Sequence, residues 1–474
     1  MAEALRPGTS IDGFVLEERI HHGSMAEIWR VKDPGASTLV MKVPAFREGD
    51  DPASIVGFEV EQMILPTLSG PHAPRFVAAG DWSVQPYIVM EHITGPSLRE
   101  RLDQTPLAPA ETASLGARIA DALHDVHGQH VIHLDVKPSN ILFRGDGTAV
   151  LIDFGLSRHD RLPDLLAEQF RLPMGTGPYI SPEQIAQVRN DPRSDLFALG
   201  VVLYYLATGE RPFGNPTSVR GLRKRLYRDP VPPRGRNPGC PPWLQEVVLR
   251  CLEVSPADRY ETASHVAFEL RHPDAVPLTA RAERSSRDGA LTVWKRRFRR
   301  LGAEPEARRS VEERLSRAPL IAVALDLSPG GEALSGALAR TAHRVLETEP
   351  GARLACLSVL KTSRIALDPT LDAEGRSIRV RRLVELQHWA RPLGSAAGRV
   401  THHVLEAPDP AAALLEFAAA NHVDHILVGA RGSSTLRRYL GSVSSRIVAE
   451  APCTVTVVRT EPRDAGSEAP DISP

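Results

Sequence analysis

Two short clusters of polar residues contain side chains that could handle a phosphoryl group. The first runs from His133 to Asn140, and the second is the triplet Asp153-Phe154-Gly155. Phosphoryl transfer needs a carboxylate close to the attacking hydroxyl, together with oxygen ligands for Mg²⁺. Asp135 can supply the first of these, and Asn140 and Asp153 the second, because Mg²⁺ prefers hard oxygen donors. The two clusters therefore indicate phosphoryl-transfer chemistry.

In their order and spacing, the two clusters resemble the catalytic loop and the metal-binding triplet of bacterial-type Ser/Thr protein kinases. The resemblance implies that Asp135 orients the substrate hydroxyl, Lys137 steadies the transferring phosphate, and Asn140 and Asp153 bind Mg²⁺. It also implies ATP as the phosphoryl donor and protein Ser or Thr side chains as acceptors. Lys137 and Thr176 are typical of Ser/Thr kinases rather than Tyr kinases.

The same resemblance assigns residues around the nucleotide. Lys42 matches the strand lysine that holds the α- and β-phosphates, and Glu61 matches its helix partner, with Glu59 as the alternative. The other residues expected beside the nucleotide lie in the phosphate loop and in the hinge below the adenine: Gly23, Ile28, Met90 as gatekeeper, Glu91 and Ile93.

The chain departs from the kinase pattern at two places. Of the three glycines expected in the phosphate loop only Gly23 is present, so a pseudokinase scaffold that binds nucleotide or partners without catalysis is the alternative. Leu134 stands where many kinases have an Arg that binds a phosphate on the activation segment. Residues 158–175 contain no Ser, Thr or Tyr. We therefore expect that phosphorylation of this segment does not switch activity.

The pattern of apolar residues predicts the elements that position these side chains. Short strands are expected at Phe14–Ile20, Glu27–Val31 and Leu39–Val43, with a turn at 33–35, and a helix at Glu111–His127. Strands followed by helices favour an α+β architecture of two lobes, the bilobal protein kinase fold, over residues 13–272.

After Leu320, strands and helices alternate, which predicts a parallel α/β sheet. The strands are expected at Leu320–Leu325, Arg353–Val359, Thr401–Leu405, His425–Val428 and Thr454–Val458, and the helices at Glu332–Leu346 and Ala411–Ala420. Asp326 follows the first strand, where α/β folds bind ligands. Gly429, Gly432 and Gly441 could let backbone N–H groups approach phosphates, with Ser442 opening a helix; alternatively, these glycines only make turns.

Residues 318–460 resemble the universal stress proteins, of the adenine nucleotide alpha hydrolase-like fold. The resemblance implies a second nucleotide at Asp326, Gly429, Gly432, Gly441 and Ser442, and a homodimer formed through the last strand. This domain would sense a nucleotide or mediate dimerisation. The eight residues between Gly432 and Gly441 are one fewer than is typical of that family. The tail 461–474 is polar, which predicts disorder.

The remaining features concern location and partners. A net charge of −1 gives no sign of nucleic-acid binding. The four cysteines form no C-x-x-C pair and the N-terminus has no apolar signal segment, so we expect a reduced, cytoplasmic setting. Residues 273–317 are expected to form a basic linker. Its run 294–300 is either a solvated helix or a contact with an anionic membrane or an acidic partner.

Overall fold

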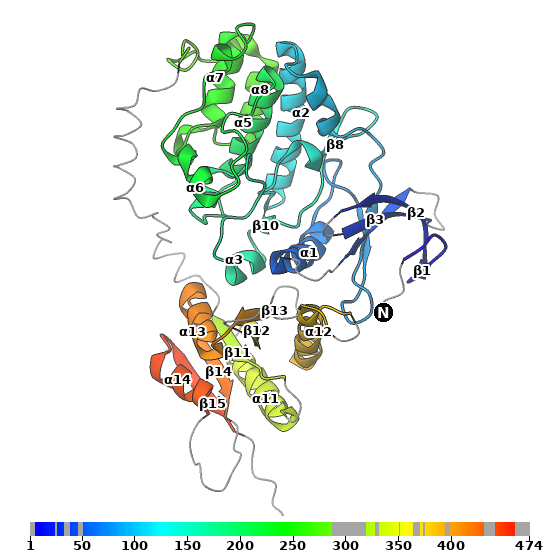
Figure 1. Cartoon of the computed structure of the whole chain (residues 1–474), viewed down its shortest axis with the longest axis vertical. Helices are drawn as coiled ribbons and strands as arrows, with labels where there is room; N and C mark the ends of the chain where they lie inside the picture. Colours follow the sequence, from blue (N-terminus) through cyan, green and yellow to red (C-terminus); the bar gives the residue numbers. More distant parts are fainter. Residues whose placement is uncertain are drawn as a thin grey trace, which may run out of the picture. The chain divides into compact units, whose positions relative to one another are not determined.

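The structure is a computed structural model of the chain, and its elements are drawn in Figure 1. It describes residues 5–23, 26–32, 38–45, 51–286, 319–327, 331–349, 351–363, 370–372, 375–393, 399–430 and 441–459. The chain divides into two compact units, one containing the described residues up to 286 and the other those from 319 onward. Each unit has its own sheet and its own core.

The first unit begins with an antiparallel sheet in the order β1-β2-β3-β4-β6-β5. Its strands are β1 (Ser10–Ile11), β2 (Phe14–His22), β3 (Ala26–Lys32), β4 (Leu39–Pro44), β5 (Phe76–Ala79) and β6 (Ile88–Glu91). Trp29, Met41 and Val89 lie in the core that these strands share. Helix α1 (Pro52–Ile64) starts where the Asp51 side chain accepts a hydrogen bond from the N–H of Ala53, and it continues into η1 (Leu65–Thr67).

The large lobe is mainly helical. Its longer helices are α2 (Pro109–Gly128), α5 (Arg193–Thr208), α7 (Pro242–Cys251) and α8 (Ala263–Arg271). The shorter ones are α3 (Leu165–Gln169), α4 (Pro182–Ile185), α6 (Val219–Leu222) and the 3₁₀ turns η2 (Leu98–Gln104), η3 (Pro138–Asn140), η4 (Arg223–Leu226), η5 (Pro233–Gly235), η6 (Pro256–Asp258) and η7 (Pro273–Ala275). Two small antiparallel sheets pair β7 (Val131–Ile132) with β10 (Arg158–His159), and β8 (Ile141–Phe143) with β9 (Ala149–Leu151). Helix α5 is buried along most of its length, as expected of a helix that is apolar on all sides.

A buried ion pair ties the end of the activation segment to the large lobe. Arg259, whose side chain is fully buried, donates two hydrogen bonds to the carboxylate of Glu183, at 2.6 and 2.8 Å. Ser194 donates a third to the same carboxylate, at 2.7 Å. The pair joins residues that lie 76 positions apart in the sequence.

The packed unit extends beyond the last helix of the large lobe. The buried side-chain amide of Gln245, in α7, donates to the backbone carbonyls of Arg281, Ala282 and Arg284. Arg281 also forms ion pairs with Glu246 and Glu253. Residues 273–286, which we expected to begin the linker, are thus held on the large lobe. The remainder of the expected linker, 287–317, lies outside the described residues.

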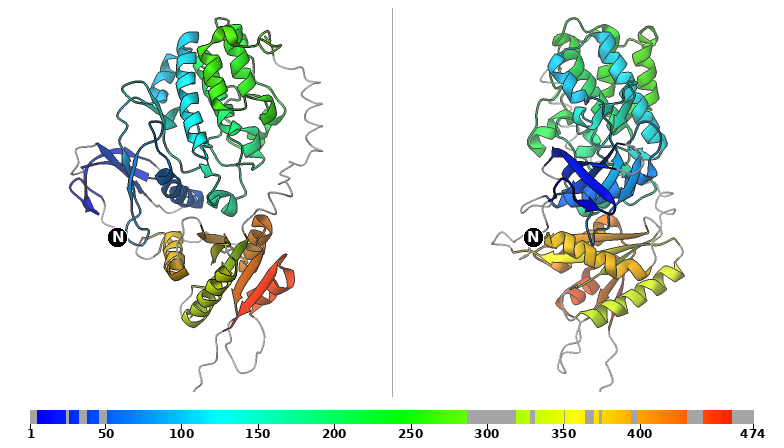
Figure 2. Two further views of the ribbon diagram at one scale, coloured as in Figure 1. Left: turned by 180° about the vertical axis from the view of Figure 1, so that it is seen from behind. Right: turned by 90° about the vertical axis from the view of Figure 1, so that its right-hand side faces the viewer.

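The second unit is a fully parallel sheet in the order β13-β12-β11-β14-β15. The strands are β11 (Leu320–Ala324), β12 (Arg353–Lys361), β13 (Val400–Ala407), β14 (His425–Gly429) and β15 (Thr454–Val458), and the helices are α11 (Glu332–Thr348), α12 (Ile378–Ala390), η8 (Arg391–Leu393), α13 (Pro410–Asn421) and α14 (Ser442–Glu450). The chain first adds strands on one side of β11 and then on the other. Because parallel crossovers are right-handed, α11 and α12 cover one face while α13 and α14 cover the other, as the two views in Figure 2 show.

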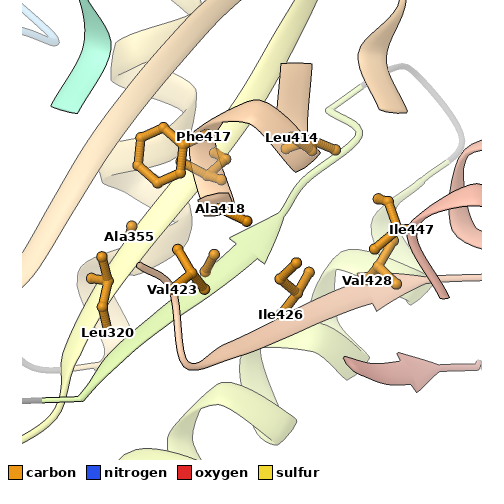
Figure 3. Close-up of a cluster of buried hydrophobic side chains, with 11 residues drawn as sticks. Leu320, Ala355, Leu414, Phe417, Ala418, Val423, Ile426, Val428 and Ile447 are labelled. Atoms are coloured by element: carbon orange, nitrogen blue, oxygen red, sulfur yellow. The ribbon is translucent and has the colours of Figure 1, made fainter. Parts of the chain in front are cut away.

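The core under α13 and α14 explains why this sheet forms. Leu414 and Phe417 of α13 and Ile447 of α14 pack on side chains of the central strands, among them Ile426 and Val428 (Figure 3). Strands buried on both faces read as nearly continuous apolar runs, and this is the pattern that predicts them. Both parts of the predicted fold class are confirmed. The turn at 33–35 and the tail 461–474 lie outside the described residues.

Candidate active site

Lys42 lies at the centre of an ion-pair network between the two lobes. Its Nζ atom is 2.5 Å from Oε2 of Glu61, in α1, and 3.0 Å from Oδ1 of Asp153. Burial alone would lower the pKa of Lys42, but the charges of Asp153 and Glu61 outweigh it and raise that pKa above its ordinary value. The charge of Lys42 in turn lowers the pKa of Asp153. Of the two glutamates proposed as the partner of Lys42, the structure places Glu61 against it.

Close backbone packing fixes the triplet 153–155 against α1. A Cβ atom added to Gly57, in α1, would lie 3.1 Å from the carbonyl oxygen of Gly155, and one added to Gly155 would lie 3.2 Å from the oxygen of Gly57. Glycine at both positions lets the two backbones touch. The ring of Phe154 is fully buried, and its centre lies 5.0 Å from the ring centre of His133 in the catalytic loop.

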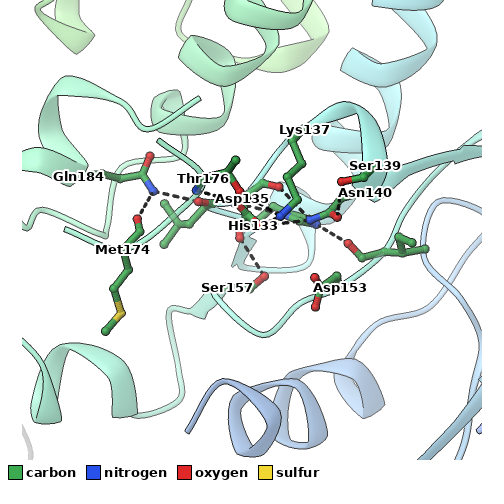
Figure 4. A network of polar contacts seen from close by, with 12 residues as sticks. His133, Asp135, Lys137, Ser139, Asn140, Asp153, Ser157, Met174, Thr176 and Gln184 are labelled. Carbon is green, nitrogen blue, oxygen red and sulfur yellow. Dashed lines mark hydrogen bonds and ion pairs between the residues drawn. The ribbon is translucent and has the colours of Figure 1, made fainter. Parts of the chain in front are cut away.

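The catalytic loop places Asp135 in a dense set of hydrogen bonds (Figure 4). Lys137 Nζ is 2.6 Å from Oδ2 of Asp135 and 3.0 Å from Oγ1 of Thr176. Thr176 donates both its backbone N–H and its hydroxyl to Oδ1 of Asp135, at 3.0 and 2.8 Å. The amide of Asn140 donates to the backbone oxygen and to Oδ2 of Asp135. Asp135 and Lys137 are therefore neighbours, and Thr176 joins them from the activation segment.

The backbone of this loop is held in a conformation that is unusual for residues other than glycine. Leu134 in this loop has a φ of +61°, and Asp153 in the neighbouring triplet has one of +66°. The buried carboxylate of Asp195, in α5, accepts the N–H groups of His133 and Leu134, both at 2.8 Å. These bonds and the surrounding packing stabilise a backbone that would otherwise be strained. Asp195 thus positions the catalytic loop from a helix that lies more than sixty residues further along the chain.

The residues expected around the nucleotide come from adjoining strands of the small lobe. Gly23 lies at the turn between β2 and β3, with its N–H 3.0 Å from the oxygen of Ala26. Ile28 in β3 pairs across the strands with Lys42 in β4. Met90, in β6, and Ile93 are buried close to the connection between the lobes.

The side chain of Glu91 has a structural task. Two nitrogens of Arg144 bind its carboxylate, and the hydrogen bond with Arg144 lowers the pKa of Glu91. The carboxylate of Glu91 is therefore bound within the protein, by Arg144 of the large lobe. Arg144 lies in the large lobe, far along the chain, and no local sequence signal points to this pair.

The comparisons with known proteins agree with this geometry. Residues 14–270 match the family model described as the protein kinase domain. The chain belongs to the protein kinase family. Residues 320–459 match the universal stress protein family.

Several curated relatives are bacterial kinases. Serine/threonine-protein kinase PknB of Mycolicibacterium smegmatis is 32% identical over 287 residues, which is 58% of this chain and 46% of the relative. PknB of Mycobacterium tuberculosis is 31% identical over 292 residues, or 59% and 47% of the two chains. The probable PknB of Corynebacterium glutamicum is 32% identical over 283 residues, or 57% and 44%. The kinase chain thus spans about half the length of these relatives.

In the universal stress protein domain, the structure brings together some of the residues expected at a second nucleotide. Strands β11 and β14 are neighbours in the sheet, so Asp326 after β11 and Gly429 at the end of β14 lie at the same edge. This is the point where the strand order reverses, which is where ligands bind in open α/β sheets. Gly441 caps α14, and Ser442 is its first residue. Gly432 lies outside the described residues.

Proposed function

We propose that this chain is an ATP-dependent Ser/Thr protein kinase. The observation that carries the proposal is the joint arrangement of Lys42 with Glu61 and Asp153, and of Asp135 with Lys137 and Thr176. A scaffold without catalysis would not need Asp135 where a substrate hydroxyl binds, nor the ion-paired Lys42 where the phosphates of ATP bind.

The donors near Asp153 suit Mg²⁺. The Asn140 amide nitrogen donates to Asp135, and its amide oxygen, which accepts a 3.3 Å hydrogen bond from the hydroxyl of Ser139, has a second lone pair for a metal ion. Asp153 contributes a carboxylate that is only partly buried. One carboxylate and one amide oxygen are hard donors of the kind Mg²⁺ takes together with phosphate oxygens and water. When bound, Mg²⁺ would neutralise charge on the phosphates.

The side chains of the kinase domain then have distinct tasks. Glu61 holds the Lys42 ammonium in place for the α- and β-phosphates. Asp135 accepts the hydrogen bond of the substrate hydroxyl and so orients its oxygen. Lys137, held by Asp135 and Thr176, offers its charge to the transferring phosphate. Most of the catalytic effect would come from positioning and from fixed charges.

We further propose that the active arrangement does not depend on a phosphate in the activation segment. Asp164 pairs with Arg189 at 2.9 Å, and Arg189 also donates to the backbone oxygen of Leu156. The buried amide of Gln184 donates to the oxygens of Leu134 and Met174. These contacts hold both ends of the segment without a phosphoryl group.

Transfer of labelled phosphate from ATP in the presence of Mg²⁺ tests the activity, with protein and peptide acceptors. We expect label with the wild type and none with Asp153→Asn, which keeps the shape of the side chain but loses its charge. If the folded wild type transfers no label, the activity is absent and the scaffold alternative, favoured by the single glycine of the phosphate loop, takes its place.

For the second domain, we propose nucleotide binding at the β11–β14 edge and pairing of two chains through β15. Asp326 and Gly429 support the first idea by their position. The second rests on β15 being an edge strand, which offers unpaired backbone groups to another copy. Calorimetric titration of Asp326→Ala with ATP tests the site; Asp153→Asn leaves this domain untouched and serves as its control. Light scattering of the full chain tests the dimer.

Where the protein resides is also open to test. In the parts of the chain that the structure describes, each helix is too short or too polar to cross a lipid bilayer. We propose a cytoplasmic location, which cell fractionation would check.

A further inference from the structure

Arg225, in η4, is a buried cation with an unusual set of partners. About 1% of its surface is exposed. Its Nη2 atom donates to the carbonyl oxygen of Gly177 at 2.8 Å, and its Nη1 donates to that of Ile180. The guanidinium also lies over the ring of Phe213, 5.1 Å from its centre. Arg225 therefore holds loop 177–180 in place through hydrogen bonds to its backbone carbonyls.

No carboxylate balances this charge among the residues that the structure describes. The Nε atom of Arg225 is buried there without a hydrogen-bond partner. Burial lowers the pKa of the guanidinium to about 10, so it still carries its charge at neutral pH. A cation bound only by neutral carbonyl groups leaves a positive potential around the loop that it supports.

Loop 177–180 directly follows Thr176, which binds the carboxylate of Asp135. Thr176, which precedes Gly177, donates to Oδ1 of Asp135 through its N–H and its hydroxyl. A substrate hydroxyl bound at Asp135 would therefore bring the residues on one of its sides close to loop 177–180. An extended chain advances about 3.3 Å per residue, so the first three residues on that side come within reach of the loop and its rim.

The rim of the loop is strongly basic. From 211 to 228 the sequence contains six Lys or Arg residues and no Asp or Glu. Four of them are exposed: Arg220, Arg223, Lys224 and Arg228. Leu222 packs with Ile180 and Ile185, and this contact holds α6 and η4 against the loop.

We propose that this segment selects protein substrates that carry Asp or Glu within about three residues of the phosphorylated hydroxyl, on the side that crosses loop 177–180. The inference rests on the proposed kinase activity and names its substrate class. The exposed cations would contact the acidic side chains directly. Arg225 is a positioning residue, which acts through the loop. Complementary charge of this kind speeds encounter and discriminates between partners, and it weakens as salt screens it.

Peptides with a single Thr test the inference. In the first series, the three residues before the Thr are all Glu, all Ala or all Lys. In the second series, the three residues after the Thr are varied in the same way. The acceptors are compared on the full-length wild type, on Arg223→Glu/Lys224→Glu, and on Lys32→Glu, which reverses an exposed charge of the small lobe. Both altered residues of the double variant are exposed, so its folding should be unaffected.

We expect the wild type to prefer Glu over Lys peptides by about tenfold or more in kcat/KM, in one series only, mainly through the peptide KM. The double variant should lose this preference or reverse it, with the KM for ATP unchanged, and Lys32→Glu should keep it. Equal rates for Glu and Lys peptides with the wild type would overturn the inference while leaving the kinase activity in place.

Peptide binding separates the two proposals. If the wild type phosphorylates none of these peptides, the kinase activity is judged by the protein acceptors, and fluorescence anisotropy of labelled peptides decides the docking inference by itself. Tighter binding of the Glu peptides in one series, weakened in the double variant, would uphold it. Binding without regard to charge would overturn it.

Discussion

The hydroxyl of Thr176 donates a 2.8 Å hydrogen bond to Oδ1 of Asp135, across more than forty positions of sequence. Lys137 reaches both residues, so the three form a closed set. Thr176 therefore joins the end of the activation segment to the catalytic loop. It is also the hydroxyl residue of that segment that would be tested first as a phosphorylation site.

Replacing Thr176 therefore tests structure rather than modification. Thr176→Ala should lower kcat by about 10- to 100-fold, because a hydrogen bond to a charged group contributes about 1.5–3 kcal/mol and each 1.4 kcal/mol changes a rate tenfold. Thr176→Ser should retain most of the activity. Thr176→Glu should not rescue it, since a second carboxylate would repel Asp135. Recovery of kcat with Glu would instead indicate control by phosphorylation.

An acidic substitution at Ser157 would not test phosphorylation there, because the Ser157 hydroxyl is buried and donates to the backbone oxygen of His133.

The contact between Gly57 and Gly155 gives a second prediction. An alanine inside a helix is ordinarily more stable than a glycine by roughly 0.5–1 kcal/mol. At Gly57 the added methyl group would press on the backbone of Gly155 at 3.1 Å, so Gly57→Ala should bring no gain in Tm and should lower kcat by displacing Asp153. Gly128→Ala is the matched control, because nothing lies within 4 Å of its added Cβ. Equal Tm and kcat in the two variants would refute the role of the contact.

The docking of residues 273–286 on the large lobe gives a third prediction. Gln245→Glu removes the amide that donates to three backbone carbonyls, and places a carboxylate against them. We expect a loss of about 1–3 kcal/mol in the free energy of unfolding. Hydrogen exchange in residues 277–286 should rise well before global unfolding. The same change at the exposed Gln104 should leave both measurements unaltered. Unchanged exchange in Gln245→Glu would mean that other contacts hold the segment.

The fourth prediction concerns pH and the second domain. Burial, with a smaller effect of His403, lowers the pKa of His402 to about 4. The unfolded imidazole takes up its proton near pH 6.5, whereas the folded one remains neutral, so acid favours the unfolded state. Stability should fall as pH drops from about 6.5 towards 4, by on the order of 3 kcal/mol.

Thermal unfolding followed from pH 7.5 to 4.5 measures this dependence. His402→Gln should flatten the slope for the transition of the second domain, whereas His343→Gln, at an exposed histidine paired with Glu347, should not. An equal slope in the wild type and in His402→Gln would assign the acid sensitivity to other groups.

The elements of the fold followed from local pattern to differing extents. The strands expected at Phe14–Ile20 and Leu39–Val43 appear as β2 and β4, because apolar residues there alternate or run together as buried strands require. Helix α12 was not among the predicted elements. Its sequence is rich in arginine, and it is held by Leu383 and Leu386, which bury themselves against the sheet. The buried positions of α12 recur at helical spacing, but the first of them is Arg379, which interrupts the apolar pattern.

By itself, the sequence indicated phosphoryl-transfer chemistry and the family of each of the two domains. Asp135, Asn140 and Asp153 lie in short motifs whose residue types suit a hydroxyl and Mg²⁺, and the order of strands and helices distinguishes the two folds. Only the tertiary structure decided the choice of Glu61 over Glu59, the joining of Thr176 to Asp135, the support of loop 177–180 by Arg225, and the docking of 273–286 on the large lobe. Each of these depends on contacts between residues far apart along the chain. The folded backbone sets their distances, and no local spacing encodes them.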